Sequence, residues 1–443
     1  GDDRGWFKEN WQREKMTALG LPDFGPVQQN ISFNTRAGTT RGIHAEPWDK
    51  WVSVASGRVF GAWVDLREGP DFGAVATAEL DSSRAVFVPR GVGNAFQTLV
   101  PETSYTYLVN DHWSREAEYV FLNLADETAA IDWPIPLTDA VLSAADRTHP
   151  RMAQVQPVRP RKILVLGADG QLGRALRDHL GNEAEYASRA DLDITDPDLP
   201  QSRRWQDYHA IINAAAYTAV DAAEGPAGRL AAWQVNATAV ARLAQVAATH
   251  RLTLVHFSTD YVFDGDATGP YREDAVPCPV SVYGQSKAAG ELAAAAARQH
   301  YVLRTSWLIA EGRNFVATMA ALAERGVDPR VVGDQVGRLT FAEDLAGAAV
   351  HLLRRQAPFG IYHVTAAGPA RSWADIARQV FRLSGHDPQR VTEVSTAEYT
   401  TAAGPLAPRP RNSMLDLAKI TATGYHPRDG DASLAQYLTQ PRG

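Results

Sequence analysis

The sequence is almost devoid of cysteine: Cys278 is the single one among 443 residues. No disulfide can form within the chain, which is typical of proteins from a reducing compartment. No apolar run approaches the roughly 18 residues of a membrane span. With a net charge of −7, the chain also lacks the excess of basic residues that nucleic-acid-binding proteins carry. We therefore expect a cytoplasmic protein that has neither a membrane nor a nucleic acid as its partner.

A chain of this length exceeds what one hydrophobic core supports and predicts two or three domains. In residues 1–147, short apolar and β-branched runs alternate with turn residues, which predicts an all-β jelly-roll barrel. Residues 148–160 contain three prolines and no apolar period, and this composition predicts a semi-extended linker. Residues 161–443 open with a β-run and a glycine loop, which predicts an α/β domain of the Rossmann type.

Histidine is also scarce before residue 161, where only His44, His112 and His149 occur. A metal site in a barrel needs two or three imidazoles and a carboxylate that converge, usually with an H-x-H pair. The sequence contains no such pair in this region. We therefore expect a metal-free pocket, and no second histidine in a position to replace His44.

Short motifs in a fixed order cover nearly the whole of the first segment. They occupy residues 3–7, 28–30, 41–44, 64–67, 87–89, 132–134 and 142–146. In these motifs the segment resembles the dTDP-4-dehydro-6-deoxyglucose 3,5-epimerases. These enzymes are cupin barrels that use no metal and act as dimers with exchanged strands. The resemblance therefore implies a homodimer formed through the barrel.

The same resemblance implies a role for each of four side chains. His44 would remove the protons from C5 and C3 of the keto sugar, and Asp146 would orient its ring. Lys50 would stabilise the enolate, and Tyr107 would return a proton from the opposite face. Contacts with the nucleotide sugar would come from Arg4, Phe7, Glu9, Gln28, Asn30, Arg41 and Asn94.

Two alternatives stay open in this segment. Without the resemblance, a lone histidine such as His44 is more often a satisfied turn residue, and Lys50 is more often a solvated charge. The sequence also departs from the family, because Asn94 stands where most members carry histidine. An amide still donates a hydrogen bond but does not titrate, which leaves the extent of C3 epimerisation open.

The β-run at residues 162–166 is followed by a loop that contains Gly167, Gly170 and Gly173. Glycines between a strand and a helix let the backbone approach a pyrophosphate at the helix N-terminus. The remaining predicted cofactor contacts are Gln171, Leu172, Ser188, Arg189, Asp193, Ile194, Ala214, Ala215 and Ala216. An arginine at position 189 accepts a 2′-phosphate, which favours NADPH without excluding NADH.

Tyr283 and Lys287 are four residues apart, so a helix places them on one face. An ammonium beside a phenol lowers the tyrosine pKa toward neutrality and yields a general acid or base. The alternative is an amphipathic helix with a half-buried tyrosine and a solvated lysine. Thr259, at the end of a predicted strand, completes the hydroxyl–Tyr–Lys set of the extended short-chain dehydrogenases, and both residues 283 and 287 would also contact the cofactor.

Further motifs narrow this second resemblance to the dTDP-4-dehydrorhamnose reductases. They occupy residues 215–221, 235–237, 304–307, 314–315, 334–335 and 409–413, with Glu224. The resemblance implies a small C-terminal substrate lobe and a sugar contact from Trp307. The two halves would then act in sequence, forming dTDP-4-dehydro-L-rhamnose and reducing it with NAD(P)H to dTDP-L-rhamnose. The alternatives are the opposite C4 configuration, a dTDP-6-deoxy-L-talose, or a regulatory subunit that binds nucleotide without catalysis.

Overall fold

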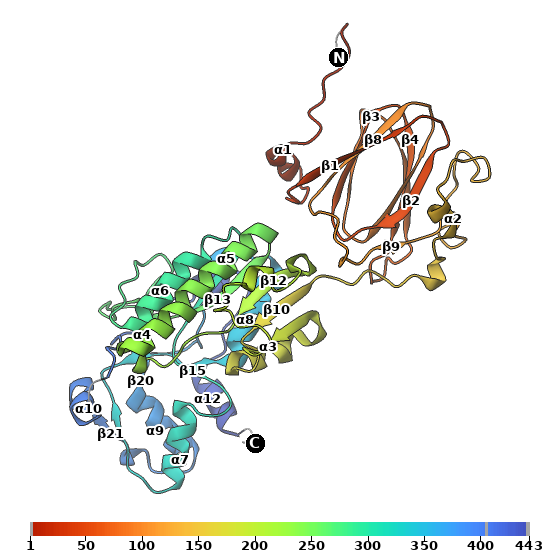
Figure 1. Cartoon of the computed structure of the whole chain (residues 1–443). Helices are drawn as coiled ribbons and strands as arrows, with labels where there is room; N and C mark the ends of the chain where they lie inside the picture. Colours follow the sequence, from red (N-terminus) through yellow and green to blue (C-terminus); the bar gives the residue numbers. More distant parts are fainter. Residues whose placement is uncertain (1–2, 404–405, 440–443) are drawn as a thin grey trace. The chain divides into compact units, whose positions relative to one another are not determined.

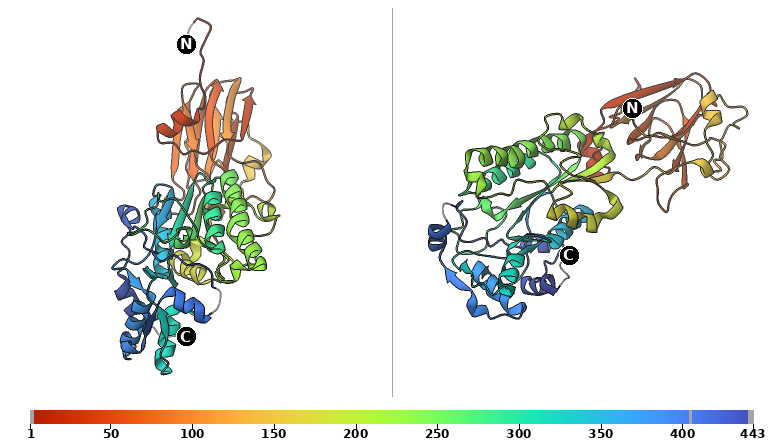
Figure 2. Two further views of the ribbon diagram at one scale, coloured as in Figure 1. Left: turned by 90° about the vertical axis from the view of Figure 1, so that its left-hand side faces the viewer. Right: turned by 60° about the horizontal axis from the view of Figure 1, so that its bottom comes forward.

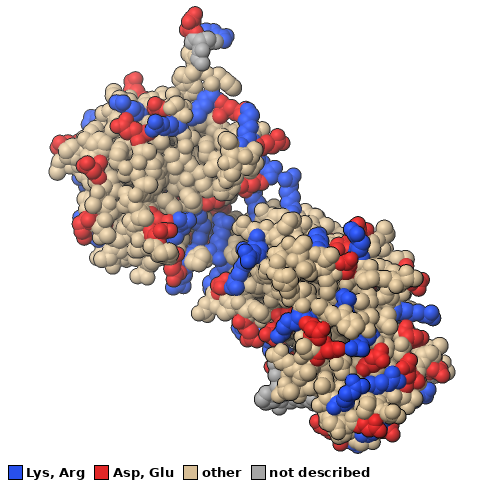
Figure 3. All heavy atoms as spheres, turned by 180° about the vertical axis from the view of Figure 1, so that it is seen from behind, with Lys and Arg blue, Asp and Glu red and all other residues tan. Residues whose placement is uncertain are grey.

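The computed structural model describes residues 3–403 and 406–439. The chain divides into two compact units, Gly1–Pro160 and Arg161–Gly443, and each is described by itself. In the described part of the chain, no helix has both the length and the apolar character that crossing a membrane requires. Over the face of the second unit that Figure 3 shows, Lys and Arg side chains are interspersed with Asp and Glu.

The first unit is a barrel of two antiparallel sheets (Figure 1). The four-stranded sheet has the order β1 (Gln28–Asn34), β8 (Thr103–Val109), β3 (Lys50–Ser56) and β6 (Ala85–Val88). The five-stranded sheet has the order β5 (Val75–Leu80), β4 (Val59–Asp65), β7 (Val92–Thr98), β2 (Thr40–Ala45) and β9 (Val120–Phe121). Apolar side chains such as Val52, Val64 and Leu122 fill the interior. The predicted all-β jelly-roll fold is confirmed.

Two short helices belong to this unit, α1 (Arg13–Ala18) and α2 (Ala144–Thr148). The segment 148–160, predicted as a linker, is largely part of the barrel unit. Met152, Val155 and Val158 are buried in the barrel core, and Val158 forms a β-bridge with Arg67. The prediction of a linker over the whole segment was therefore wrong, because three spaced apolar residues give it a surface on which to pack.

The second unit is built on a parallel six-stranded sheet. Its spatial order is β11 (Ala184–Ala187), β10 (Lys162–Leu166), β12 (Tyr208–Asn213), β13 (Thr253–Thr259), β14 (His300–Thr305) and β19 (Gly360–His363). Helices cover both faces (Figures 1 and 2). One face carries α3 (Gln171–Leu180) and α8 (Ala342–Arg355), and the other carries α4 (Pro226–Trp233), α5 (Ala239–His250) and α6 (Val282–Ala294). Burial on both faces explains the continuous apolar runs of these strands.

The chain leaves β10 toward β11 on one side and continues to β12 on the other. Such a switch point leaves a crevice at the carboxyl ends of the central strands, where ligands of open α/β sheets bind. The predicted Rossmann-type fold is confirmed.

The predicted C-terminal lobe is also present, with its own core around Val316, Ile376 and Phe381. The lobe and its surroundings contain helices α7 (Phe315–Glu324), α9 (Trp373–Leu383), α10 (Thr396–Ala403), α11 (Ala418–Ala422) and α12 (Gly430–Thr439). Short strands complete it: β15 (Leu308–Ile309), β16 (Arg330–Val332), β17 (Val336–Gly337), β18 (Thr340–Phe341), β20 (Arg371–Ser372) and β21 (Thr392–Val394).

Candidate active sites

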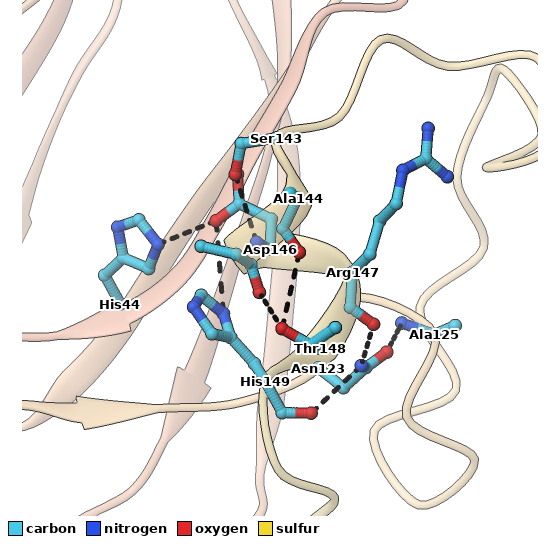
Figure 4. Close-up of polar contacts among 10 residues, drawn as sticks. His44, Asn123, Ala125, Ser143, Ala144, Asp146, Arg147, Thr148 and His149 are labelled. Carbon is cyan, nitrogen blue, oxygen red and sulfur yellow. Dashed lines mark hydrogen bonds and ion pairs between the residues drawn. The ribbon is translucent and has the colours of Figure 1, made fainter.

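The barrel brings His44 on β2 against Asp146 on α2, although the two are 102 positions apart. His44 Nε2 lies 3.0 Å from Asp146 Oδ1 (Figure 4). Ser143 caps the short helix: its hydroxyl donates to Asp146 Oδ2 at 2.8 Å and accepts from the Asp146 N–H. Burial by itself would raise the pKa of Asp146, but hydrogen bonds from His44 and Ser143 outweigh it and lower that pKa. Asp146 is therefore an ionised partner for the histidine.

A second histidine lies beside this pair. His149 Nδ1 is 3.9 Å from Asp146 Oδ1, and the His149 and His44 rings are 5.4 Å apart. The argument that the ligands of a metal do not converge in this unit was therefore wrong. The expectation that no other histidine can replace His44 as the base stays a prediction, although His149 lies beside it. His149 directly follows α2 in extended backbone, so that only three positions separate it from Asp146 in the sequence.

Lys50 and Tyr107 meet inside the barrel on the neighbouring strands β3 and β8. Lys50 is 4% exposed, and its Nζ lies 5.7 Å from the centre of the Tyr107 ring. Lys50 pairs with Glu46, which also accepts a hydrogen bond from Trp48 Nε1 at 3.1 Å. Lys50 is thus a buried charge rather than a solvated one, and Glu46 is a site residue that the sequence analysis missed.

Asn94 lies on β7 directly opposite His44 on β2. Its Oδ1 accepts hydrogen bonds from Trp63 Nε1 and from the Tyr105 hydroxyl, both at 3.0 Å. An indole N–H only donates, so these contacts fix which end of the amide is the oxygen. The NH₂ end is left to donate elsewhere.

Only some of the residues predicted to contact the nucleotide lie on the barrel of this chain. Gln28 and Asn30 lie side by side on β1, where Gln28 Nε2 donates to Asn30 Oδ1 at 2.8 Å. Arg41 on β2 donates to Asn34 at 3.2 Å. Arg4, Phe7 and Glu9 instead belong to the segment before α1, which projects from the barrel in Figure 1. Phe7 is 95% exposed, so it lines no pocket of its own chain.

In the second unit, the glycine loop between β10 and α3 is tightly packed. Gly167 has a φ of +74°, and a Cβ atom there would lie 2.7 Å from the backbone nitrogen of Ala215. A Cβ atom on Gly173 would lie 2.4 Å from the Gly167 carbonyl oxygen. Glycine is required at both positions, which lets the helix N-terminus approach the ends of β10 and β12.

Beside this loop is a cavity of about 340 Å³. Its lining contains most of the residues predicted to hold the cofactor, namely Gly167, Gly170, Arg189, Asp193, Ile194, Ala214, Ala215 and Ala216. Arg189 is 82% exposed in its side chain and donates from Nε to Asp193 at 3.1 Å, so it lies where a ligand can reach it. The residues present thus fit a dinucleotide, with backbone at the pyrophosphate end and an arginine at the adenosine end.

Six predicted cofactor contacts lie outside this lining. Two of them, Tyr283 and Lys287, belong to the cluster described below, and the other four lie at the start of α3 and after the end of β11. Leu172 is buried in the core, and Gly173 packs against the glycine loop. The side chain of Gln171 donates to the Glu311 carbonyl at 3.0 Å, and the Ser188 hydroxyl donates to a carboxylate at 2.7 Å. These four residues therefore support the glycine loop and the end of β11 rather than line the cavity.

Thr259, Tyr283 and Lys287 come together where β13 ends and α6 begins. Ser281 caps α6 by accepting from the Gly284 N–H at 3.1 Å, and Tyr283 follows in the first turn. Tyr283 is hydrogen-bonded to the side chain of Thr259. Lys287 is buried and donates from Nζ to the Phe257 carbonyl at 2.5 Å. The predicted set is thus one cluster.

The expected direction of the Tyr283 pKa was wrong. Burial, followed by the neighbouring Asp260 and Tyr261, raises the pKa of Tyr283 above its ordinary value, although its hydrogen bond with Thr259 lowers it. Burial also lowers the pKa of Lys287 to about 8. Removal of each group from water disfavours its charged form, so that Tyr283 is held as the protonated phenol.

Two further groups lie near this cluster, of which Asp260 was not predicted as a site residue and Arg409 was predicted only as part of the 409–413 motif. Asp260 is buried, accepts from the Thr259 hydroxyl at 3.0 Å, and has its pKa raised by burial to about 6. Arg409, from the C-terminal segment, donates from Nη2 to both carboxylate oxygens of Asp221 at 2.9 Å and so ties the lobe segment to the sheet. Asp260 directly follows Thr259 in the sequence, and this adjacency was the available signal.

Trp307 belongs to the segment that joins the sheet to the C-terminal lobe. Its ring stacks on Trp373 with 3.8 Å between ring centres. Trp307 has a φ of +45°, and its backbone carbonyl accepts from the Thr340 N–H at 3.2 Å. The residue is therefore held in place by both its ring and its backbone.

The fold and the two sites define the class of the protein. A cupin barrel with a histidine–carboxylate pair is joined to a short-chain dehydrogenase unit with a Thr–Tyr–Lys cluster beside a dinucleotide crevice. Residues 1–154 match the family described as dTDP-4-dehydrorhamnose 3,5-epimerase, and residues 161–442 match the RmlD substrate binding domain. The chain belongs to both families, which makes it a bifunctional enzyme of the dTDP-L-rhamnose pathway.

Individual relatives agree with this assignment. A protein RmlC homolog of Streptococcus pyogenes is 49% identical over 170 residues, which are 37% of this chain and 85% of that protein. A dTDP-4-dehydrorhamnose reductase of Aggregatibacter actinomycetemcomitans is 40% identical over 293 residues, which are 62% of this chain and 97% of that protein. The crystal structure of a Bacillus anthracis dTDP-4-dehydrorhamnose reductase in complex with NADP is 32% identical, with a TM-score of 0.58. It covers 63% of this chain and 98% of its own.

Proposed function

We propose that the chain converts dTDP-4-dehydro-6-deoxyglucose in two consecutive steps, with His44 and Asp146 serving the first and Tyr283, Thr259 and Lys287 the second. The observation that carries the proposal is that one chain contains both sets, each with its partners in contact. A regulatory subunit would have no use for a buried lysine facing a tyrosine inside the barrel.

In the barrel, the Nε2–H of His44 donates to Asp146, which leaves Nδ1 as the nitrogen that accepts a proton from the sugar. Removal of the C5 proton gives an enolate at O4, and the ammonium of Lys50 stabilises its charge. Tyr107 then returns a proton to C5 from the opposite face, and the same exchange at C3 completes the isomerisation. Asn94 is oriented to donate its NH₂ group to a sugar oxygen.

In the second unit, the residues around the glycine loop and Arg189 would hold the nicotinamide cofactor, which would supply the hydride for C4 of the sugar. Tyr283 donates its proton to the oxygen at C4, and the Thr259 hydroxyl holds that oxygen. The raised pKa of Tyr283 suits this direction, since the residue is protonated at neutral pH and ready to donate. Lys287 in its charged form stabilises the phenolate that remains, and Trp307 contacts the sugar.

We propose NADPH as the preferred cofactor and NADH as the second choice. Arg189 at the mouth of the cavity is exposed and pairs with a carboxylate that a 2′-phosphate would replace. The Bacillus anthracis relative contains NADP.

We also propose that the barrel forms a homodimer. Ile31 and Phe33 on β1 are 68% and 58% exposed, and Trp6 and Phe7 on the N-terminal segment are 56% and 95% exposed. A second copy would cover these apolar groups and receive Arg4 and Phe7 in its substrate pocket.

A cytoplasmic location, where dTDP-sugars are made, is consistent with the single cysteine.

The test is to supply dTDP-4-dehydro-6-deoxyglucose with NADPH and to identify the product by NMR. We expect dTDP-L-rhamnose together with stoichiometric oxidation of NADPH. A dTDP-6-deoxy-L-talose product would assign the opposite C4 configuration. Failure to oxidise NADPH with either the keto sugar or its epimer would contradict the reductase role.

A further inference from the structure

Three side chains of ligand type converge between β2 and α2 (Figure 4). His44 Nε2 and His149 Nδ1 lie 3.0 and 3.9 Å from the same oxygen, Asp146 Oδ1. All three donor atoms lie within 4.8 Å of one another. A zinc ion binds nitrogen and oxygen at about 2.0–2.2 Å, so the ligand atoms of a tetrahedral site are roughly 3.3 Å apart. The two measured separations bracket this value.

The second observation is an unsatisfied nitrogen. His149 Nδ1 is buried and makes no hydrogen bond. The ring is hydrogen-bonded to the backbone of Gly42 and Leu122, and because Nδ1 has no partner, these bonds belong to its other nitrogen. A buried polar atom without a partner is uncommon, and a bound ion is one of the explanations for it. Its lone pair faces Asp146, where a metal ion would need it.

The segment that carries the ligands is held in place by hydrogen bonds. Asn123 donates from Nδ2 to the backbone carbonyls of Arg147 and His149 at 3.1 and 3.0 Å. Ser143 holds the other carboxylate oxygen of Asp146 at 2.8 Å. Such support fixes ligands in orientation before a metal arrives. The site is therefore built, and is not a chance meeting of mobile side chains.

The local charge also suits a cation. In the described part of the chain, the side chains of opposite-charge type within 4.0 Å of the Asp146 carboxylate are those of His44 and His149, and no lysine or arginine pairs with it. The side chain of Arg147 points away from the carboxylate in Figure 4. Two imidazoles and one carboxylate select zinc and similar transition metals over magnesium or calcium. His44 is 34% exposed, which leaves an open position for water.

We propose that His44, Asp146 and His149 form a binding site for Zn²⁺ that switches the epimerase half off when it is occupied. A neutral imidazole that ligates through Nε2 carries its proton on Nδ1. That nitrogen is the one to which the proposed mechanism assigns the removal of sugar protons, so the bound metal leaves His44 without a free lone pair. The inhibition rests on the proposed role of His44, whereas the metal binding does not.

The first experiment uses the unaltered full-length chain freed of metal by a chelator. This reference state exchanges the C5 hydrogen of the keto sugar with deuterated water. One equivalent of Zn²⁺ should suppress that exchange in proportion to its occupancy, and a chelator should restore it. NADPH-dependent reduction of pre-epimerised sugar by the same chain should continue. Exchange that persists with zinc bound, or loss of both activities together, would overturn the switch.

Direct binding is measured with Co²⁺ as a spectroscopic substitute for zinc. One equivalent should give the visible absorption of a four-coordinate site, and X-ray absorption of the zinc-loaded chain should show two imidazole ligands. His149→Gln should weaken zinc binding by at least ~10-fold, the loss that follows even removal of an outer-shell partner. The matched control His112→Gln removes an exposed histidine of the same unit and should bind zinc as the unaltered chain does.

The outcomes separate the two proposals. Absence of metal binding to the unaltered chain would overturn the metal site and leave the proposed epimerase mechanism standing. Binding through both histidines without loss of exchange would overturn the switch, and with it the assignment of His44 as the base. X-ray absorption on the unaltered chain keeps the test valid if His149→Gln does not fold.

Discussion

The two units prepare their catalytic groups in different ways. In the barrel, His44 is partly exposed and is governed by a direct contact with a charged partner, Asp146, 3.0 Å away. In the α/β unit, burial dominates: it raises the pKa of Tyr283 and lowers that of Lys287 to about 8. The histidine site thus depends on a neighbouring carboxylate, whereas the tyrosine site depends on the exclusion of water.

The two sites also differ in how far apart their catalytic residues lie in the sequence. The barrel pair is joined across 102 positions, whereas Tyr283 and Lys287 lie one helical turn apart. Variants of each site should therefore affect one activity and leave the other unchanged.

The largest effect is expected from His44→Ala. Loss of the base should lower C5 exchange by ~10³–10⁴-fold, the upper part of the range for general base catalysis. Deuterium incorporation measured by NMR gives this rate, and reduction of pre-epimerised sugar by the same variant is the control. Loss of both activities in a folded chain would contradict two independent sites. Residual exchange that disappears when His149→Gln is added would identify His149 as a substitute base.

Tyr283→Phe should slow reduction by at least ~100-fold, because the proton donor for the oxygen at C4 is removed. Binding of NADPH should survive, since Tyr283 lies outside the lining of the dinucleotide cavity. NADPH absorbance with pre-epimerised sugar measures the rate, and fluorescence titration measures the binding. Near-normal oxidation of NADPH would remove Tyr283 from the mechanism.

Asp146→Asn should have a smaller effect on exchange than His44→Ala, about 10–100-fold, as is typical when the partner of a functional histidine is changed. The imidazole remains, but it loses the carboxylate that orients it. The rate of C5 exchange measures this effect, with reduction again as the control. An Asp146→Asn variant as inactive as His44→Ala would show that the carboxylate itself transfers protons.

The smallest effect concerns pH. Reduction should decline above about pH 8 as Lys287 loses its proton. Burial lowers this pKa from 10.5, so between the two values the unfolded chain holds more protons, and the free energy of unfolding rises with pH across that window. The profile of kcat/KM for reduction measures the decline. In Lys287→Arg, which keeps its charge, an inflection near pH 8 would refute the assignment.

Features confined to one loop or one turn were predictable from the sequence. The glycines around Gly167 and the pair Tyr283 and Lys287 depend on local geometry, because a β-to-α turn or a single helical turn fixes their spacing. The order of short strands likewise indicated the barrel. The family resemblance supplied His44 and Asp146 before any contact between them was known.

Other features depend on groups that are distant in the sequence and that folding brings together. Residue spacing carries no measure of how much water is removed from Tyr283, and burial reversed the expected direction of its pKa. The approach of His149 to His44 required the end of α2 to pack beside β2. The packing of Val158 on the barrel likewise turned an expected linker into part of the first unit. Sequence spacing determines which groups share a turn, whereas charge, solvent access and long-range contact are properties of the packed molecule.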